Sequence, residues 1–295
     1  MKITYKSSLA LILALFFGFS LLQAQSLSPN RKGAKKGSGK RKSTFAGASA
    51  PGDFVEKTEK GQVNWTDQYV EAEGNSVFDT TRFRIKNQAK LMAQRGAIVD
   101  AQRNLLEIVN GVLVEGQTTV KDLAVESDDV KTKVSGLLKG AVQVGKTKYE
   151  DGVATVRLRI PLYADGLAEA VDTTAPPVSP TPTVSPDSIP QNVVLAVSGS
   201  YKPRLFPKLT DDQNKIILNM ADAFDPTHGK APKIVQQTTA TVEALKGKKG
   251  VELLEASQDL LGNLVLNEKS KARVEKWKTA GLLVWGLVKK LILPI

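Results

Sequence analysis

The longest regular pattern of small and apolar positions lies between residues 80 and 111. Four alanines recur there at four-residue spacing, and Leu105 and Val109 continue the same row; the alanines are Ala89, Ala93, Ala97 and Ala101. Residues four apart share one face of a helix. Most other residues in the segment favour helix, and Gly111 stands where helices commonly end. The pattern predicts one long helix over Thr80–Gly111, with a ridge small enough for a sheet to approach closely.

Alternating apolar and polar positions predict strands on both sides of this helix. Residues 61–74 contain strand-forming Val, Trp and Tyr residues and end at Gly74, and Thr118, Val120, Leu123 and Val125 suggest a strand over residues 118–125. Ser127, Asp128 and Asp129 are typical of a helix start with acids at its positive end. A short helix should therefore run from there to Gly140.

A β-hairpin is the clearest local signal. Asp151-Gly152 separates two alternating runs, which is a strong signal for a two-residue turn. After the turn, one face carries Ala154, Val156, Leu158 and Ile160, and the other carries Thr155, Arg157 and Arg159. The resulting order β-α-β-α-β-β predicts an α+β fold: a mostly antiparallel sheet with a long helix and a short helix on one face.

A proline-rich segment divides the chain. Residues 172–190 contain six prolines among Ser and Thr, a composition typical of an extended spacer. We therefore expect one α+β domain over residues 54–171 and a second small α+β domain over 191–295. The second should contain a strand near 192–199, a hairpin around Thr210–Asn214 and a helix over Glu268–Thr279. The apolar run 280–288 is too short to span a bilayer and is interpreted as core or a sheet-closing strand.

The first 24 residues are typical of a signal peptide. Lys2 and Lys6 precede an apolar run from Leu9 to Leu22, and a cut after Ala24 is the expected processing site. Leu22 is larger than the residue preferred three positions before such a cut, so an uncleaved anchor is the alternative. Either outcome places the rest of the chain outside the cytosol, in the periplasm or at the outer-membrane periphery.

The basic character of the chain belongs to the segment that follows. The net charge is +11, and no acid occurs between residues 25 and 52, where the basic residues are Arg31, Lys32, Lys35, Lys36, Lys40, Arg41 and Lys42. Residues 25–53 have too few apolar positions to fold and should form a disordered basic tail. These cations are candidates for contact with an anionic lipid or cell-wall polymer; a solvated tether is the other interpretation. The leader argues against nucleic acid.

Motifs for catalysis are sparse. The chain has no Cys, which excludes disulfides and thiol chemistry. Gly140–Thr147 matches the phosphate-loop pattern GxxxxGK[ST], but a helix precedes it and a hairpin follows, the reverse of the context that phosphate binding needs. The single histidine, His228, lies near Asp222 and Asp225 and could join them only in a weak metal site or a hydrolase. We expect no catalytic, cofactor-binding or metal-binding residues.

Three segments together carry a family likeness: GQVNWTDQYVEAEGNS, the stretch from AKLMAQRGAIVDAQRNLLEIVNG to LLKGAVQV, and DGVATVRLRIPL. Residues 61–163 resemble the bacterial envelope family typified by a twenty-kilodalton outer-membrane lipoprotein, and are similar to the N-terminal domain of flagellar assembly protein T. KPRLFP and GNLVLNEKSKARVEKWKTAG resemble, more weakly, the segment that follows this domain in longer relatives. Without a cysteine, lipid attachment of the kind found in some relatives is excluded.

The resemblance implies a non-enzymatic module of the cell envelope. Together with the leader, it predicts an exported protein that acts in structure, assembly or protein–protein interaction, through an envelope partner or through self-association. The alternative is a module that binds an anionic envelope polymer or membrane surface through the basic tail.

Overall fold

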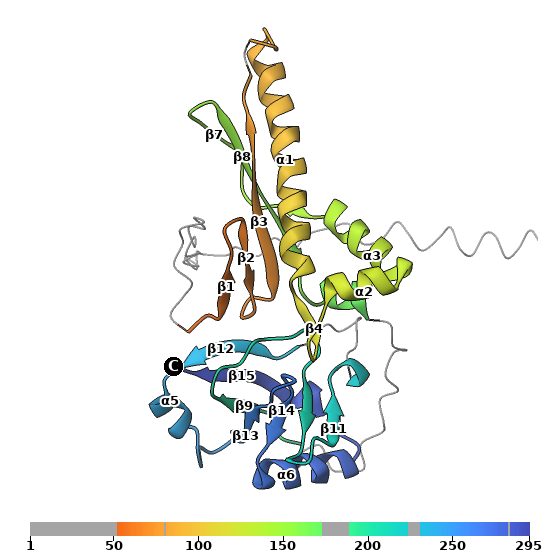
Figure 1. Cartoon of the computed structure of the whole chain (residues 1–295). Coiled ribbons are helices and arrows are strands. Elements are labelled where there is room, and N and C mark those ends of the chain that lie inside the picture. The colour runs from red at the N-terminus through yellow and green to blue at the C-terminus, as the bar shows by residue number, and fades with distance from the viewer. Residues whose placement is uncertain (1–51, 80, 173–188, 224–230, 283) are drawn as a thin grey trace, which may run out of the picture. The chain divides into compact units, whose positions relative to one another are not determined.

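The computed structural model describes residues 52–79, 81–172, 189–223, 231–282 and 284–295. All of them lie within one compact unit, Ala48–Ile295. The fold is α+β, as the sequence predicts, with one antiparallel sheet, one mixed sheet and a long helix (Figure 1). The expected signal peptide, nearly all of the basic tail and most of the proline-rich segment lie outside the described residues.

The first sheet is antiparallel, in the order β1-β2-β3-β8-β6, with β7 also paired to β8. Its strands are β1 (Val55–Lys57), β2 (Gly61–Asn64), β3 (Tyr69–Val77), β6 (Val142–Gln143), β7 (Lys148–Glu150) and β8 (Val153–Pro161). The segment 61–74, expected to be one strand, is two strands joined by a turn. The segment before the Asp-Gly hairpin is likewise split into β6 and β7.

The long helix α1 (Lys86–Asn110) packs on the face of this sheet formed by β3 and β8 (Figure 1). The predicted ridge is confirmed, since Ala89, Ala93, Ala97 and Ala101 are all buried. The helix starts later than expected, because the described residues between 81 and 85 form turns and bends. Gly111 follows the helix; its N–H donates to the Ile108 carbonyl, and the N–H of Val112 donates to the Val109 carbonyl.

The hairpin at Asp151-Gly152 is confirmed. Both residues have positive φ, 50° and 75°, as a primed two-residue turn requires. The alternation along β8 is confirmed as well: its apolar side chains at 154, 156, 158 and 160 are buried beneath α1, and its Thr and Arg side chains face away. This alternation therefore sets which face of the sheet belongs to the core.

The expected strand over 118–125 is wrong. Leu113–Glu115 (β4) and Thr118–Thr119 (β5) form a small two-stranded sheet, and Val120–Glu126 is helix α2. Thr119 and Asp122 form a reciprocal capping box, which satisfies free N–H groups at the helix start and outweighs the strand preference of the valines. Helix α3 (Asp128–Lys139) is as predicted, with Ser127 as its N-cap, and packs against α1, α2 and α4 (Leu167–Val171).

The second sheet is mixed, in the order β11-β10-β14-β13-β9-β15-β12. Four neighbouring strands, β13, β9, β15 and β12, run parallel, and β10 with β11 form the expected antiparallel hairpin. The strands are β9 (Val193–Ser198), β10 (Lys208–Thr210), β11 (Ile216–Asn219), β12 (Lys233–Gln237), β13 (Glu252–Gln258), β14 (Leu264–Leu266) and β15 (Val288–Pro294).

Short helices accompany this sheet. They are a 3-10 turn at Ala221–Ala223, α5 (Thr239–Glu243), α6 (Glu268–Thr279) and α7 (Val284–Leu287). Helix α6 has the predicted bounds and begins with the side chain of Asn267 accepting from the Ser270 N–H. Most of the apolar run 280–288 is not strand: α7 occupies its second half, and β15 begins only at Val288.

Hydrogen bonds to main-chain carbonyls join residues on the two sides of the proline-rich segment. The N–H groups of Leu205 and Phe206 donate to the carbonyls of Leu113 and Val114, so the KPRLFP segment lies beside β4. At a second place, the Thr66 hydroxyl donates to the Ile234 carbonyl at 2.5 Å. Buried side chains of both sheets belong to one continuous hydrophobic cluster. The segment from 201 to 206 is therefore held by residues that precede the proline-rich stretch.

Candidate binding cleft

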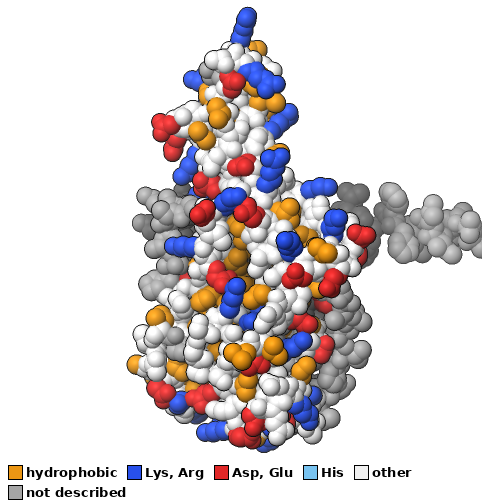
Figure 2. All heavy atoms as spheres, in the orientation of Figure 1, with side chains coloured by type: hydrophobic (Ala, Val, Ile, Leu, Met, Phe, Trp, Pro, Cys, Tyr) orange, Lys and Arg blue, Asp and Glu red, His pale blue; other side chains and the backbone are white. Residues whose placement is uncertain are grey.

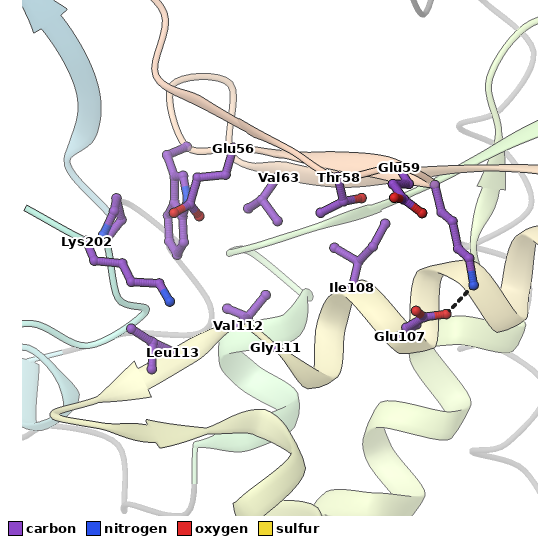
Figure 3. Close-up of a pocket in the computed structure, with 13 residues that line it drawn as sticks. Glu56, Thr58, Glu59, Val63, Glu107, Ile108, Gly111, Val112, Leu113 and Lys202 are labelled. Carbon is purple, nitrogen blue, oxygen red and sulfur yellow. Dashed lines mark hydrogen bonds and ion pairs between the residues drawn. The ribbon is translucent and has the colours of Figure 1, made fainter.

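A cleft of about 470 Å³ opens where β1, β2 and the C-terminal end of α1 meet the segment at Lys202 (Figure 3). Its apolar wall is made of Val63, Trp65, Ile108, Val112, Leu113 and Pro203. Its polar residues are Glu56, Thr58, Glu59, Lys60, Glu107 and Lys202. Most of the labelled side chains from both sides point toward the space between the strands and the helix. The cleft thus combines an apolar floor with a charged rim.

Close packing at Gly61 shapes the floor. A Cβ on this residue would lie 2.1 Å from the Glu71 carbonyl oxygen and 2.6 Å from Cδ1 of Ile108, so only glycine fits. The main chain of β2 can therefore approach the end of α1. Beside it, the Trp65 indole is only 2% exposed, and its Nε1–H donates to Glu56 at 2.7 Å. That hydrogen bond satisfies the buried indole and fixes one carboxylate at the cleft.

The rim carries an ion pair that links the strand side to the helix side. The Lys60 ammonium donates to Glu107 at 2.6 Å, and this hydrogen bond, with the attraction between the charges, raises the pKa of Lys60 above its usual value. Both side chains are largely exposed, so the pair contributes little to stability. Glu59 and Lys202 are also exposed at the opening. An incoming ligand can therefore move the exposed side chains of the rim without disturbing the buried residues of the wall.

This arrangement is suited to binding. An apolar side chain of a partner can desolvate the wall, and the rim can accept or donate hydrogen bonds around it. The cleft brings together no nucleophile with an adjacent base. Among the described residues, no group of three or more His, Cys, Asp or Glu side chains is placed to hold a metal ion.

A second hollow, of about 670 Å³, lies beside the carboxyl ends of β9 and β13. Two of its acids, Glu243 and Glu255, are both held by Lys246, at 2.8 and 2.9 Å. The ammonium and the other hydrogen bonds lower the pKa of Glu255. We take the cleft at Trp65 as the candidate binding site because its apolar wall combines residues from the strands, the end of α1 and the segment at Lys202.

The residues singled out from the sequence are not brought into the cleft. Arg31, Lys32, Lys35, Lys36, Lys40, Arg41 and Lys42 lie outside the described residues, as do Asp225 and His228. Asp222 is in the 3-10 turn at Ala221–Ala223. In the phosphate-loop match, Gly140 follows α3, Val142–Gln143 form β6, and strand β7 begins directly after Thr147. No helix follows the motif, so its amides do not form a phosphate cradle at a helix start.

A scan against protein-family models gives no match, and a search of curated proteins gives none either. No helix in the described part of the chain is long and apolar enough to cross a membrane. The fold and the cleft define the class of molecule: an α+β protein with two large sheets, a small two-stranded sheet and an amphipathic cleft.

Proposed function

We propose that this chain is an exported, non-enzymatic protein of the cell envelope that works as a structural or assembly module by binding a protein partner. The observation that carries the proposal is the cleft at Trp65. Its floor is apolar, its rim is charged, and it lies beside the KPRLFP segment. Such a surface is suited to an exposed apolar side chain on another protein or on a second copy of this one.

The sequence supports the location. A leader with an apolar core precedes the basic tail, and residues 61–163 resemble an envelope lipoprotein family and the N-terminal domain of flagellar assembly protein T. Fractionation of cells that produce the full chain tests this part of the proposal. Recovery with the periplasmic or outer-membrane fraction is expected, and recovery in the cytosol would remove the basis for an envelope role.

The partner contact is tested by filling the cleft. Since the chain has no Cys, a Glu59→Cys variant carries one unique thiol at the rim. A bulky maleimide on that thiol should block an incoming side chain, while the unlabelled variant should still bind. The chain is crosslinked in the envelope fraction, and the proteins attached to it are measured. We expect labelling to reduce the recovered amount of one specific envelope protein, or of a second copy of this chain, by about tenfold.

The matched control is Glu275→Cys, labelled in the same way. Glu275 is an exposed acid in α6 and does not line the cleft. Labelling there should leave recovery unchanged. If the same proteins are recovered with and without the Glu59→Cys label, the cleft is not the contact surface.

The second candidate function uses the basic tail. Seven of the basic residues fall within residues 31–42 without an acid among them, a composition that favours screened attraction to an anionic lipid or cell-wall polymer. Deleting residues 31–42 separates the two functions. Retention in the envelope at low salt should persist if the folded surface does the binding, and it should be lost if the tail does.

A further inference from the structure

Cations and exposed apolar side chains gather where β3 ends and α1 begins. We call this region the cationic tip. Its basic residues are Arg82, Arg84, Lys86 and Lys90, and its apolar residues are Val77, Phe83, Ile85, Leu91 and Met92. Val77 is 72% exposed and Ile85 66% exposed, and Leu91 and Met92 are exposed as well. Figure 2 shows blue and orange side chains together at this end of the compact unit.

Among the described residues, none of the four tip cations forms a salt bridge, although Arg82 attracts the nearby Asp79 carboxylate and helps to lower its pKa. Arg82 lies over the Phe83 ring at 5.6 Å, and Lys90 lies over the Tyr149 ring at 5.2 Å. The nearest acid in sequence, Asp79, accepts hydrogen bonds from the N–H groups of Thr81 and Arg82. Glu150 and Asp151, at the neighbouring hairpin turn, are the other acids at this end.

Helix stability does not explain this composition. The first turn of α1 contains no acid, and Ile85 supplies no side-chain cap. Lys86 lies at the positive end of the helix dipole, where a cation is unfavourable. Exposing Ile85 and Val77 to water adds a second unfavourable term. Both costs are offset if the tip contacts a surface that presents anionic groups to the cations and an apolar layer to the exposed apolar side chains.

We propose that the cationic tip docks on the surface of an anionic phospholipid bilayer. Arg82, Phe83, Arg84, Ile85 and Lys86 alternate cationic and apolar side chains over five residues, so one short segment offers apolar groups for the acyl boundary and cations for the headgroups. This contact is separate from the cleft at Trp65 and from the basic tail. It goes beyond the proposed function, because it assigns a membrane contact to the folded part of the chain.

A local probe separates the tip from the tail and the leader. The full chain carrying Ile85→Cys, its only cysteine, is labelled with a polarity-sensitive fluorophore and mixed with phosphatidylglycerol vesicles. The emission should shift to the blue, and a quencher on the lipid chains should reduce it severalfold. Phosphatidylcholine vesicles should produce neither change. Leu260→Cys, in the turn between β13 and β14 and 97% exposed, is the matched control, and its label should remain in water.

A charge variant supplies an independent measurement. Arg82→Gln/Arg84→Gln/Lys86→Gln should weaken binding of the full chain to the anionic vesicles by at least about tenfold, the direction expected for three basic residues at such a surface. Lys248→Gln/Lys249→Gln/Lys276→Gln removes the same charge from exposed positions in the second sheet region and should leave binding within about twofold. The two triple variants have equal net charge, so only their positions differ.

Several outcomes would overturn the proposal. In one, the chain sediments with the vesicles but the label at position 85 stays in water. The tail or the leader would then account for all of the binding. Equal shielding by neutral vesicles removes the requirement for anionic lipid. Shielding by an envelope protein alone, without lipid, makes the tip a protein contact.

Discussion

Gly74 of β3 lies directly against Ala101 of α1. A Cβ on Gly74 would come within 2.1 Å of the Ala101 amide nitrogen and 2.3 Å of the Ala97 carbonyl oxygen. Real Cβ atoms do not approach main-chain atoms this closely, so the glycine and the alanine ridge are two halves of one close contact. This contact sets how near the long helix lies to the first sheet, and hence where its C-terminal end reaches the cleft.

Gly74→Ala should therefore destabilise the fold by about 2–3 kcal/mol, since relief of the overlap must move α1 away from β3 and loosen the surrounding core. Gly136→Ala is the matched control. Gly136 is exposed in α3, and its added methyl group meets nothing within 4 Å, so the better helix propensity should stabilise by about 0.5–1 kcal/mol. Denaturant titration of both variants should give opposite signs. Equal losses of stability in the two variants would show that the close contact at Gly74 does not set the distance between α1 and β3.

The sequence predicts the alanine half of this contact, because small residues at four-residue spacing form a ridge that a sheet can approach closely. It does not predict the other half: Gly74 was expected to end the strand, but β3 continues to Val77, so the glycine lies inside it. The Asp151-Gly152 turn could also be predicted, because a two-residue turn with positive φ values favours Asp and Gly at these positions. Residues 118–125 mislead because Thr119 and Asp122 act together: a capping box is a pair of hydrogen bonds, and the apolar spacing of Val120 and Val125 does not report it. Local hydrogen bonding therefore makes most of that segment helical instead of extended.

The cleft could not be predicted in the same way. Its wall combines Trp65 and Ile108 with Pro203, which lie far apart in the sequence, and its location depends on main-chain pairing between β4 and residues 205–206. A tryptophan within a strand-like segment indicates only a core position. Gly61 was the one usable signal, because a glycine at the start of a strand marks a place where another chain segment comes close.

Glu71 is a buried acid on the face of the first sheet opposite α1. It lies directly across from Arg159, which donates to it at 2.6 Å, and Arg157 approaches at 3.5 Å. Glu71→Gln keeps the shape but removes the charge that two guanidinium groups face. We expect a loss of about 2–3 kcal/mol, less than for a fully buried pair because Arg159 is partly exposed.

Glu73→Gln controls for the loss of a carboxylate on the same face of the same strand. Glu73 takes part in no ion pair within the described residues, so its replacement should change the free energy of unfolding by less than about 0.5 kcal/mol. Similar losses for the two variants would contradict a specific role for the Glu71 charge.

Asp211 should make stability fall in acid. Hydrogen bonds from the Lys215 and Gln213 N–H groups, together with the Lys271 ammonium, lower the pKa of this carboxyl in the folded state. The unfolded chain then binds the proton more tightly, so the stabilisation is complete above a pH of about 4 and is lost as the pH falls through the lower folded pKa. Urea midpoints measured between about pH 6 and pH 2.5 should fall less steeply for Asp211→Asn than for the parent. Asp212→Asn, at the neighbouring exposed acid, should keep the parent slope.

Arg204 holds the KPRLFP segment in place through hydrogen bonds made by its buried side chain. Its side chain is buried, Nε donates to the Gly116 carbonyl at 2.6 Å, and Nη1 donates to the Lys202 carbonyl. A Cβ on Gly262, in the turn between β13 and β14, would lie 1.6 Å from Nη2 of Arg204. The guanidinium therefore fills the space that a side chain at 262 would need, and it links three segments that are distant in the sequence.

A double-mutant cycle tests this link. Arg204→Ala leaves two carbonyls without their donor and should cost about 2–3 kcal/mol. Gly262→Ala alone must displace the guanidinium and also adopt φ of +87°, so it should cost a similar amount. In the Arg204→Ala background the overlap is gone and only the backbone strain of about 1 kcal/mol remains. The two changes should therefore be less than additive by about 1–2 kcal/mol, as measured by urea unfolding. Strict additivity would mean that Arg204 and the turn at Gly262 do not share this space in solution.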